Sequence, residues 1–363
     1  MNTKKNLLAG VLLIALLLQL ASCKKDSSGP AAKAMVQPHV TTLSSFSGPL
    51  VVSLYAGTGV PVPGDGPRLS ASFGDPWGIA ASSSGALYIT EPNWHRIRKI
   101  STSGIVSTLA FSGTLLSPLA ITRGNDGILY FIERGTGSPA TIHVRKINAN
   151  DQIQPPLEIC KKVNGTVVPY VFSDPFDLAV AADGTMYICD FNTHTIIKRG
   201  TNGIATVFAG GTQGYKDGKG TNAQFNSPIS IAIDSLNNLY VSDWLNFRIR
   251  KITPDGTVST LAGSSTSGFQ DGTGSSAQLS APADLVVADN NTLLFIDGDS
   301  GSAIRRLDLT TGQVTTIAGN ELAGYINGPA LSARFNSLTQ MTINNGNIYT
   351  TERDIHRIRQ TGL

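Results

Sequence analysis

Four polar residues have the types to form one reactive site, although they lie far apart in the chain. Each stands two residues after a proline, or after a leucine in one case, in segments that resemble one another: Asp177, Ser230, Asp284 and Gln340. Two carboxylates with a hydroxyl and an amide could hold a divalent cation such as calcium, which could activate water. These residues therefore suggest a metal-assisted hydrolase or lyase, and a polar lining without a reaction is the alternative.

Acidic residues occupy a second repeated position, at the end of a strand-like segment. They are Glu91, Glu133, Asp190, Asp243, Asp297 and Glu352. A residue type that returns in every copy of a repeat is more easily explained by the architecture than by one binding site. We expect each acid to cap its own loop or to pair with the arginine that follows it.

Basic residues and histidines recur in the same way. The arginines alternate within strand-like segments of separate repeats: Arg96, Arg98, Arg248, Arg250, Arg305, Arg306, Arg357 and Arg359. Dispersed arginines in a nearly neutral chain predict no nucleic-acid binding. His95, His194 and His356 occupy equivalent loops of different repeats, too far apart for one zinc ion to lie about 2 Å from each. We therefore predict no zinc site.

The segments that must position these residues form a repeat. Residues 240–263 read YVSDWLNFRIRKITPDGTVSTLAG, and similar stretches occur at 88–110, 187–210 and 295–319, with a weaker one from 130 and a shortened one from 349. A strand-like segment precedes each copy, and 42 to 57 residues separate these segments. Turn pairs such as Asn237-Asn238 and Asp255-Gly256 divide each unit into four antiparallel strands. Such a unit is typical of a β-propeller blade.

The two ends of the repeat region predict how the ring closes. The sixth copy stops after its third strand, and residues 52–57 (VSLYAG) resemble the missing fourth strand. Pairing the two would remove two open sheet edges. We predict an all-β fold, a six-bladed β-propeller of four-stranded antiparallel blades whose N-terminal strand completes the last blade, over residues 49–363.

The repeat resembles the NHL-repeat family of β-propellers. The resemblance rests on the following residues: Asn226-Ser227-Pro228, Leu239-Tyr240-Val241, Asp243, Asn246 to Lys251 and Val258 to Gly263. It extends over about residues 51–363 and is strongest in the first and fourth units. Membership of this family implies a six-bladed ring of four-stranded sheets.

Loops between the second and third strands differ from unit to unit, and they carry the candidates for recognition. We predict a surface for a protein or a carbohydrate from Trp94, Arg134, Phe191, Asn192, Trp244, Phe247 and Arg353. Aromatic rings beside polar groups suit both kinds of partner. Packing of these rings under neighbouring loops is the alternative. The Gly-aromatic-x-Asp/Asn-Gly motifs at 214–218, 268–272 and 324–328 are interpreted as packed turns, because they lack the spacing of an EF-hand.

The N-terminal residues predict export and anchoring. Lys4 and Lys5 precede a short apolar run from Leu7 to Leu20, and Leu20-Ala21-Ser22-Cys23 resembles a bacterial lipobox. We predict a signal peptide over 1–22, a lipidated Cys23, and a flexible tether over 23–48. Without Lys4 and Lys5, 26 of the 28 basic residues remain against 25 acidic ones. The sequence leaves open whether Cys160 and Cys189 pair.

These features lead to one prediction of function and one alternative. The first is a lipid-anchored extracytoplasmic NHL-repeat propeller at the bacterial cell envelope, acting as a binding or scaffold module for a protein or glycan. The alternative is the metal-assisted hydrolase or lyase in the central channel. We expect a monomeric ring that touches the membrane through its lipid anchor only and requires no cofactor.

Overall fold

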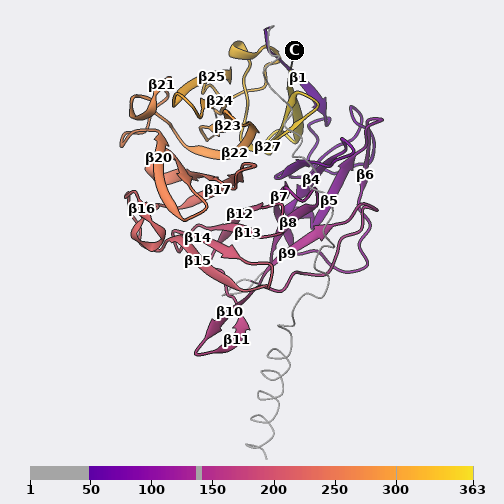
Figure 1. Cartoon of the computed structure of the whole chain (residues 1–363). Coiled ribbons are helices and arrows are strands. Elements are labelled where there is room, and N and C mark those ends of the chain that lie inside the picture. The colour runs from indigo at the N-terminus through magenta and orange to yellow at the C-terminus, as the bar shows by residue number, and fades with distance from the viewer. Residues whose placement is uncertain (1–48, 136–140, 300, 363) are drawn as a thin grey trace, which may run out of the picture.

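The computed structural model describes residues 49–135, 141–299 and 301–362, which form a ring of six antiparallel sheets (Figure 1). No helix in these described ranges is long and apolar enough to cross a membrane. Each of these six sheets is one blade, and in blades 1, 4, 5 and 6 a short strand from the entering loop adds a fifth strand at the outer edge, far from the strand at the central axis. The predicted six-bladed β-propeller is confirmed.

The blades follow one another along the chain. Blade 1 contains β2 (Gly66–Pro67), β3 (Ile79–Ala81), β4 (Leu87–Glu91), β5 (Arg96–Ile100) and β6 (Ile105–Thr108). Blade 2 contains β7 (Ser117–Arg123), β8 (Leu129–Arg134) and β9 (Ile142–Ile147). Blade 3 contains β12 (Pro175–Val180), β13 (Met186–Asp190), β14 (Thr195–Arg199) and β15 (Ala205–Gly210). A hairpin of β10 (Cys160–Val163) and β11 (Thr166–Pro169) projects from the rim before blade 3 (Figure 1).

The second half of the ring is more regular. Blade 4 contains β16 (Gly218–Lys219), β17 (Pro228–Ile233), β18 (Leu239–Asp243), β19 (Arg248–Ile252) and β20 (Thr257–Ala262). Blade 5 contains β21 (Gly272–Thr273), β22 (Pro282–Asp289), β23 (Thr292–Asp297), β24 (Ala303–Asp308) and β25 (Gln313–Gly319). Blade 6 contains β26 (Gly328–Pro329), β27 (Leu338–Asn344), β28 (Asn347–Glu352), β29 (Arg357–Gly362) and β1 (Val51–Ala56).

The N-terminal strand closes the ring as predicted. β1 pairs antiparallel with β29, with Val52 opposite Thr361 and Ser53 opposite Gln360. The other edge of β1 pairs with the short strand β26. The first and last described strands of the propeller therefore lie side by side in one sheet, and the sixth blade needs both ends of the chain.

Blade 2 departs from the predicted four strands. Its sheet contains three strands in the described residues, and the segment after β9 makes only scattered backbone bonds to it. The amide of Gln154 donates to the carbonyl of Lys146 at 2.8 Å, and the amide of Leu157 donates to Val144 at 2.8 Å. Pro155 and Pro156 stand between these two residues. Because proline has no backbone N–H, a regular fourth strand cannot form there.

The apolar cores lie between neighbouring blades. One cluster joins Ala179, Tyr187 and Cys189 of blade 3 to Ile231 and Val241 of blade 4. Alternate residues of each strand reach the two faces of its sheet, so each blade packs against both neighbours. Cys189 is a free, buried thiol, so the pairing with Cys160 that the sequence left open does not occur.

The repeated acids cap the loops that enter the inner strands. Their carboxylates accept backbone N–H bonds in every blade; the Asp243 Oδ1 atom, for example, accepts from the amide of Asn226 at 2.7 Å. The other five bind the amides of Gly74, Leu116, Ser173 with Asp174, Ser280 with Ala281, and Asn336. The prediction that these acids are architectural is confirmed.

Five of the six acids also form an ion pair with an arginine two residues into the third strand. In blade 4 the Arg250 Nη1 atom lies 2.6 Å from Asp243 Oδ2, and its Nη2 atom lies 2.8 Å from Asp217 Oδ1. The same guanidinium donates to the carbonyls of Gln224 and Lys216. We call this arrangement the arginine clasp. Its counterparts are centred on Arg98, Arg145, Arg305 and Arg359.

The predicted packed turns are the outer part of the clasp. Asp217 belongs to the motif at 214–218, and its ring, Tyr215, lies 5.1 Å from the Arg250 guanidinium. Phe225 lies at 5.1 Å from the same group. In blade 1 the Asp65 carboxylate lies 2.7 Å from the Arg98 guanidinium, as Asp217 does from Arg250 in blade 4. The loop around Asp65 is therefore a fourth copy of this turn. The aromatic of the motif thus covers a buried cation.

Removal of one clasp should destabilise the protein strongly. The side chain of Arg250 is 0% exposed, and Arg250→Met would leave the buried Asp243 carboxylate without its counter-ion. We expect a loss of about 3–5 kcal/mol in the free energy of unfolding, measured by urea denaturation. Arg306 is exposed on the equivalent strand of blade 5, so Arg306→Met should change stability by less than about 0.5 kcal/mol. Equal effects of the two substitutions would contradict the clasp.

Candidate functional site

The four polar residues predicted for the channel meet at the propeller axis. The Ser230 Oγ atom lies 2.7 Å from Asp177 Oδ2 and 3.1 Å from Asp284 Oδ1. Each of the three side chains comes from the inner strand of a different blade, because the ring brings equivalent positions of β12, β17 and β22 to one level. Gln340 lies at the same level on β27, and the four residues are all buried.

Each of these side chains binds the inner strand of a neighbouring blade. Asp177 Oδ2 accepts from the amide of Ile231 at 3.0 Å, and Asp284 Oδ2 accepts from Met341 at 2.8 Å. The Oε1 atom of Gln340 accepts from the amides of Ile79 at 3.0 Å and Ile121 at 3.3 Å. We call Asp177, Ser230, Asp284 and Gln340 the axial belt, since these residues and their partners belong to all six blades.

Burial gives the two carboxyl groups of the belt unusual acidities. Desolvation raises the pKa of Asp177 to about 6, against the bonds from Ile231, Ser230 and Leu178 that favour its charged form. Desolvation raises the pKa of Asp284 well above its ordinary value, and the charge of Asp177 adds to this effect. Both carboxyl groups lie within hydrogen-bonding distance of Ser230 Oγ, so their titrations are linked.

The belt is a poor set of metal ligands as it stands. All four carboxylate oxygens of Asp177 and Asp284 accept backbone or hydroxyl protons, so a cation would have to displace these donors. No group of three or more His, Cys, Asp or Glu side chains within the described ranges is arranged to hold a metal ion. A divalent cation in the channel stays a prediction that the geometry does not favour.

The histidines of the repeated loops serve as turn residues. His95, His194 and His356 have positive φ angles of 52°, 56° and 57°, and Phe247 occupies the same position of blade 4 with φ of 56°. The Nδ1 atom of His194 accepts from the amide of Ser227 at 3.1 Å. These residues close the turns after β4, β13, β28 and β18, on separate blades.

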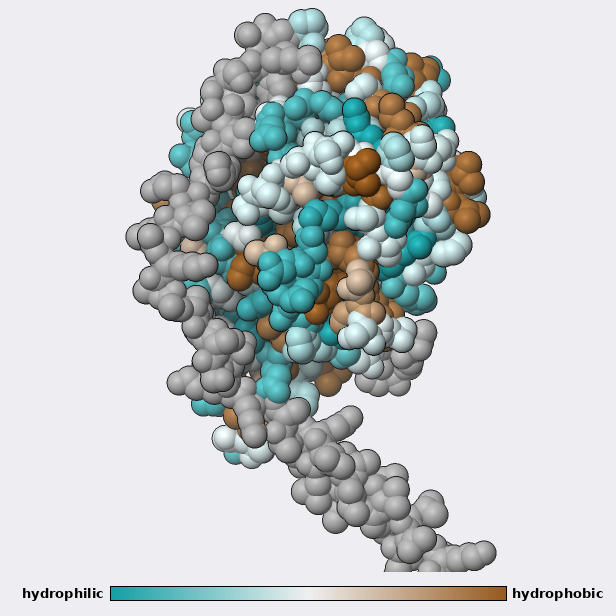
Figure 2. All heavy atoms as spheres, turned by 90° about the vertical axis from the view of Figure 1, so that its right-hand side faces the viewer, coloured by the Kyte–Doolittle hydropathy of each residue, from teal (hydrophilic) through white to brown (hydrophobic). Residues whose placement is uncertain are grey.

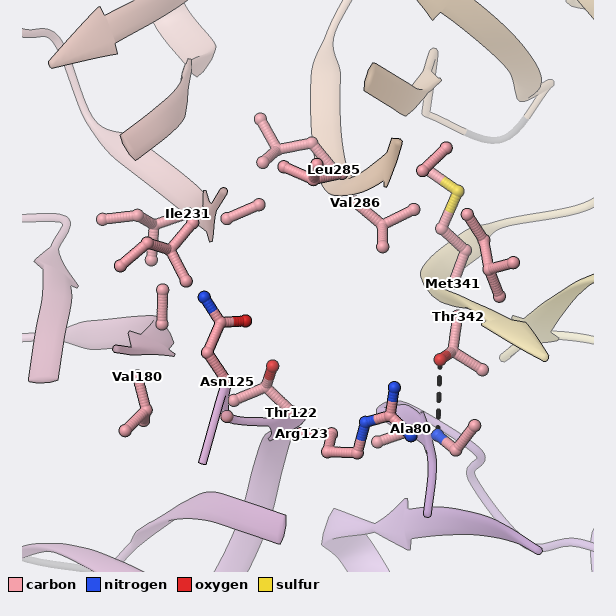
Figure 3. Close-up of a pocket in the computed structure, with 18 of the residues that line it drawn as sticks. Ala80, Thr122, Arg123, Asn125, Val180, Ile231, Leu285, Val286, Met341 and Thr342 are labelled. Carbon is pink, nitrogen blue, oxygen red and sulfur yellow. Dashed lines mark hydrogen bonds between the residues drawn. The ribbon is translucent and has the colours of Figure 1, made fainter. Parts of the chain in front are cut away.

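A cavity of about 220 Å³ lies beyond the belt and extends toward the turns between first and second strands (Figure 3). Its lining includes Arg123 and Asn125, which the sequence analysis did not select. Comparison of the six inner strands could have found Arg123. The equivalent residues of the other blades are Ala81, Val180, Ile233, Val287 and Ile343, all small or aliphatic.

The opposite end of the ring carries the aromatic residues predicted for recognition. The rings of Phe176 and Phe191 lie 5.1 Å apart, and Phe191 lies 5.9 Å from Trp244. The Arg134 guanidinium lies 5.6 Å from the Phe176 ring and forms an ion pair with Asp174. This row of Arg134, Phe176, Phe191 and Trp244, which we call the aromatic row, crosses blades 2 to 4. Phe176 had not been predicted to take part.

The other predicted surface residues lie elsewhere. Trp94 is 44% exposed but packs over Gly74 and 5.3 Å from Arg96, within its own blade. Arg353 pairs with Asp354 and lies 5.3 Å from the Trp77 ring. Phe247 is partly buried against a hydrophobic cluster of blades 4 to 6, so its part in the recognition surface stays a prediction. Asn192 is exposed beside Phe191.

Figure 2 shows the side near β6, where hydrophobic residues form small groups separated by hydrophilic ones. Such a mixture is ordinary for a surface in contact with water. Cys23, predicted to carry the lipid, lies outside the described residues.

Comparison with known proteins agrees with the fold. No protein-family model matches the chain. Protein SUPPRESSOR OF QUENCHING 1 of Arabidopsis thaliana is 36% identical over 112 residues, which are 31% of this chain and 10% of that protein. NHL repeat-containing protein 2 of Bos taurus is 24% identical over 337 residues, which are 78% of this chain and 46% of that protein. The chain spans less than half of either relative.

Solved structures share the same ring. A structural-genomics protein of Bacteroides thetaiotaomicron superimposes with a TM-score of 0.68 at 23% identity, over 86% of this chain and 76% of that one. An auxiliary nutrient binding protein of the same organism gives 0.66 at 19% identity, with the same coverage. Virginiamycin B lyase of Staphylococcus aureus gives 0.54 at 14% identity, over 86% and 99%. These likenesses concern the fold.

The site, the ring and its relatives define a six-bladed β-propeller built around an axial belt. More specifically, the chain is similar to NHL repeat-containing protein 2, which is the basis for comparing its blades with NHL repeats. Neither the fold nor the likeness identifies a ligand, because propellers of one architecture carry different functions.

The raised acidities of the belt predict a specific pH effect. An acid whose pKa is raised by folding stabilises the protein below its unfolded pKa and loses that contribution as pH rises through the folded pKa, here from about pH 4 to pH 6 and above. Asp284→Asn cannot ionise and keeps the carbonyl that binds Met341. Relative to the unmodified protein, this variant should therefore gain stability as pH rises from 4 to 8, by up to about 1.4 kcal/mol per unit.

Urea denaturation at several pH values measures this effect. Asp255→Asn is the control, because hydrogen bonds from Thr253 and Lys219 lower the pKa of this exposed carboxylate. The lowered pKa places the titration of Asp255 at or below about pH 4, so the stability difference for Asp255→Asn should stay nearly constant from pH 5 to pH 8. If the stability difference between Asp284→Asn and the unmodified protein does not change with pH, folding does not raise the pKa of Asp284.

Proposed function

We propose that this protein is an extracytoplasmic binding module whose aromatic row contacts a protein or a glycan of the cell envelope. The observation that carries the proposal is the continuous arrangement of Phe176, Phe191 and Trp244 across two blades, with ring centres 5.1 and 5.9 Å apart. Three partly exposed rings that lie side by side offer a larger contact surface than the single aromatic side chains of the other blades.

The chemistry of the row suits a polar ligand with flat apolar faces. Aromatic rings stack on sugars and form the centres of protein interfaces, and the ion pair of Arg134 with Asp174 supplies charged groups at one end. The row lies where the loops before blades 2 and 3 lack the motif that covers blades 4 to 6. A partner could therefore approach it from the open side of this face.

The structural neighbours support a binding role. Two of them, from Bacteroides thetaiotaomicron and Bacteroides ovatus, are auxiliary nutrient binding proteins with the same ring, at TM-scores of 0.66 and 0.65. A metal-assisted hydrolase or lyase in the channel is the second proposal, and it rests on the meeting of Asp177 and Asp284 at the axis. We favour the binding module, because the carboxylate oxygens of the belt already accept hydrogen bonds from backbone amides.

Substitutions in the row should reduce binding without unfolding the ring. For Phe191→Ala combined with Trp244→Ala we expect at least a tenfold weaker interaction, about 1.4 kcal/mol or more. The measurements are a glycan array and, for protein partners, cross-linking in intact cells followed by affinity measurement with the purified partner. Leu236→Ala is the control, since Leu236 is 73% exposed at the opposite end of the axis. Unchanged binding by the double variant, in both assays, would exclude the row.

Export and anchoring are part of the same proposal. A basic start, an apolar run and Leu20-Ala21-Ser22-Cys23 support cleavage before Cys23 and its lipidation. Cys23→Ala should therefore abolish incorporation of labelled fatty acid and release the protein from the membrane fraction. Cys189→Ala should leave both unchanged, because that thiol is buried in blade 3. Persistent labelling of Cys23→Ala would exclude the lipid anchor at this residue.

A further inference from the structure

We propose that the central cavity beyond the axial belt binds a small hydroxylated carboxylate, and that Arg123 holds its carboxylate group. The cavity opens at the end of the axis opposite to the aromatic row, among the turns that join first to second strands. It is therefore a second site, independent of the proposed recognition face.

Arg123 is the exceptional side chain of the inner strands. It extends from the end of β7 into the cavity (Figure 3), at a position that is small or aliphatic in the other five blades. Burial lowers the pKa of its guanidinium. A cation placed in such surroundings is costly unless something pairs with it.

No side chain in the described part of the chain pairs with Arg123, in contrast to the clasp arginines. Those arginines are held by carboxylates within 3.3 Å, whereas no ion pair or hydrogen bond of Arg123 is found among the described residues. The clasp shows how this fold stabilises a buried arginine that has an architectural function. Arg123 lacks that support, so its charge is available to a ligand.

The acidic residues that line the cavity are already engaged. Asp177 and Asp284 belong to the belt, where burial favours their protonated forms. Asp234 accepts from the amides of Leu236 and Asn238 in its turn, at 2.8 Å each. Asp289 accepts from the amide of Asn291 at 2.8 Å. Arg123 is the positively charged side chain among the described residues that line the cavity, so it is the group that can bind an anion there.

The neighbouring polar atoms suggest a ligand with hydroxyl groups. The Asn125 Nδ2 atom donates to the carbonyl of Asp234 at 3.3 Å, and its amide oxygen points toward the cavity (Figure 3). That oxygen can accept only from a donor such as a hydroxyl. The Thr122 hydroxyl lies on the same side, and Val180, Val286 and Met341 provide apolar walls.

The size of the cavity limits the ligand to a small molecule. Its volume of about 220 Å³ is below the range of about 300–1,000 Å³ typical of sites for drug-sized ligands. A planar guanidinium binds a carboxylate through two parallel hydrogen bonds. A molecule of the size of one sugar acid, with its carboxylate on Arg123 and a hydroxyl on Asn125, satisfies both polar groups.

Isothermal titration calorimetry of the purified protein tests this proposal with D-glucuronate, D-lactate, D-glucose and inorganic phosphate. We expect binding of at least one of the two hydroxy acids, at least tenfold weaker binding of glucose, which lacks the carboxylate, and weaker binding of phosphate. Arg123→Gln should lose the acid, and Arg306→Gln, which removes an equal charge from the exposed face of β24, should keep it.

Every outcome decides for or against the site. Binding of neither acid to the unmodified protein, or equal binding to Arg123→Gln, would overturn the proposal. Phosphate binding as tight as that of the hydroxy acids would overturn the ligand class. If Arg123→Gln does not fold, Arg123→Lys keeps the charge without the planar fork, and at least a tenfold loss of affinity is expected. The aromatic-row variant Phe191→Ala with Trp244→Ala should bind the acid normally.

Discussion

The arginine clasp is the interaction on which the architecture depends. A carboxylate at the end of each second strand accepts hydrogen bonds from backbone amides of the loop that enters its blade. In five blades a buried arginine of the third strand binds the same carboxylate. Because the guanidinium also binds carbonyls of the entering loop, one side chain joins three segments of chain. Backbone hydrogen bonds hold the strands of each blade together, and the clasp holds the loop that enters that blade against its second and third strands.

The ring needs a second set of links near its axis, because neighbouring blades share no backbone ladder there. The axial belt provides it: Asp177, Ser230, Asp284 and Gln340 bind inner-strand amides of adjacent blades. Two carboxyl groups at such close range are possible because burial keeps a proton with them. The residues that looked most like a catalytic pair are thus first of all a structural link, and this explains their position at the centre.

The two ends of the axis consequently differ in chemistry. Clasps and turns occupy the end with the aromatic row, where rings of different blades come into contact. The short turns at the other end surround a cavity in which Arg123 is the positively charged side chain among the described lining residues. Since the belt lies between them, events at one end need not alter the other. A propeller can in this way carry two recognition sites on one rigid scaffold.

The sequence by itself determined the six blades, the closing strand and the structural roles of the acids, because each feature repeats and local pairing defines it. For blade 2 the sequence analysis predicted four strands, and the structure forms three because Pro155-Pro156 interrupts the last one. Only the tertiary structure decided that Phe247 packs against a core cluster while Phe191 meets Trp244, and that Arg123 faces a cavity without a partner among the described residues. These outcomes depend on contacts between blades, whose positions are set by ring closure and not by neighbouring residues in the chain.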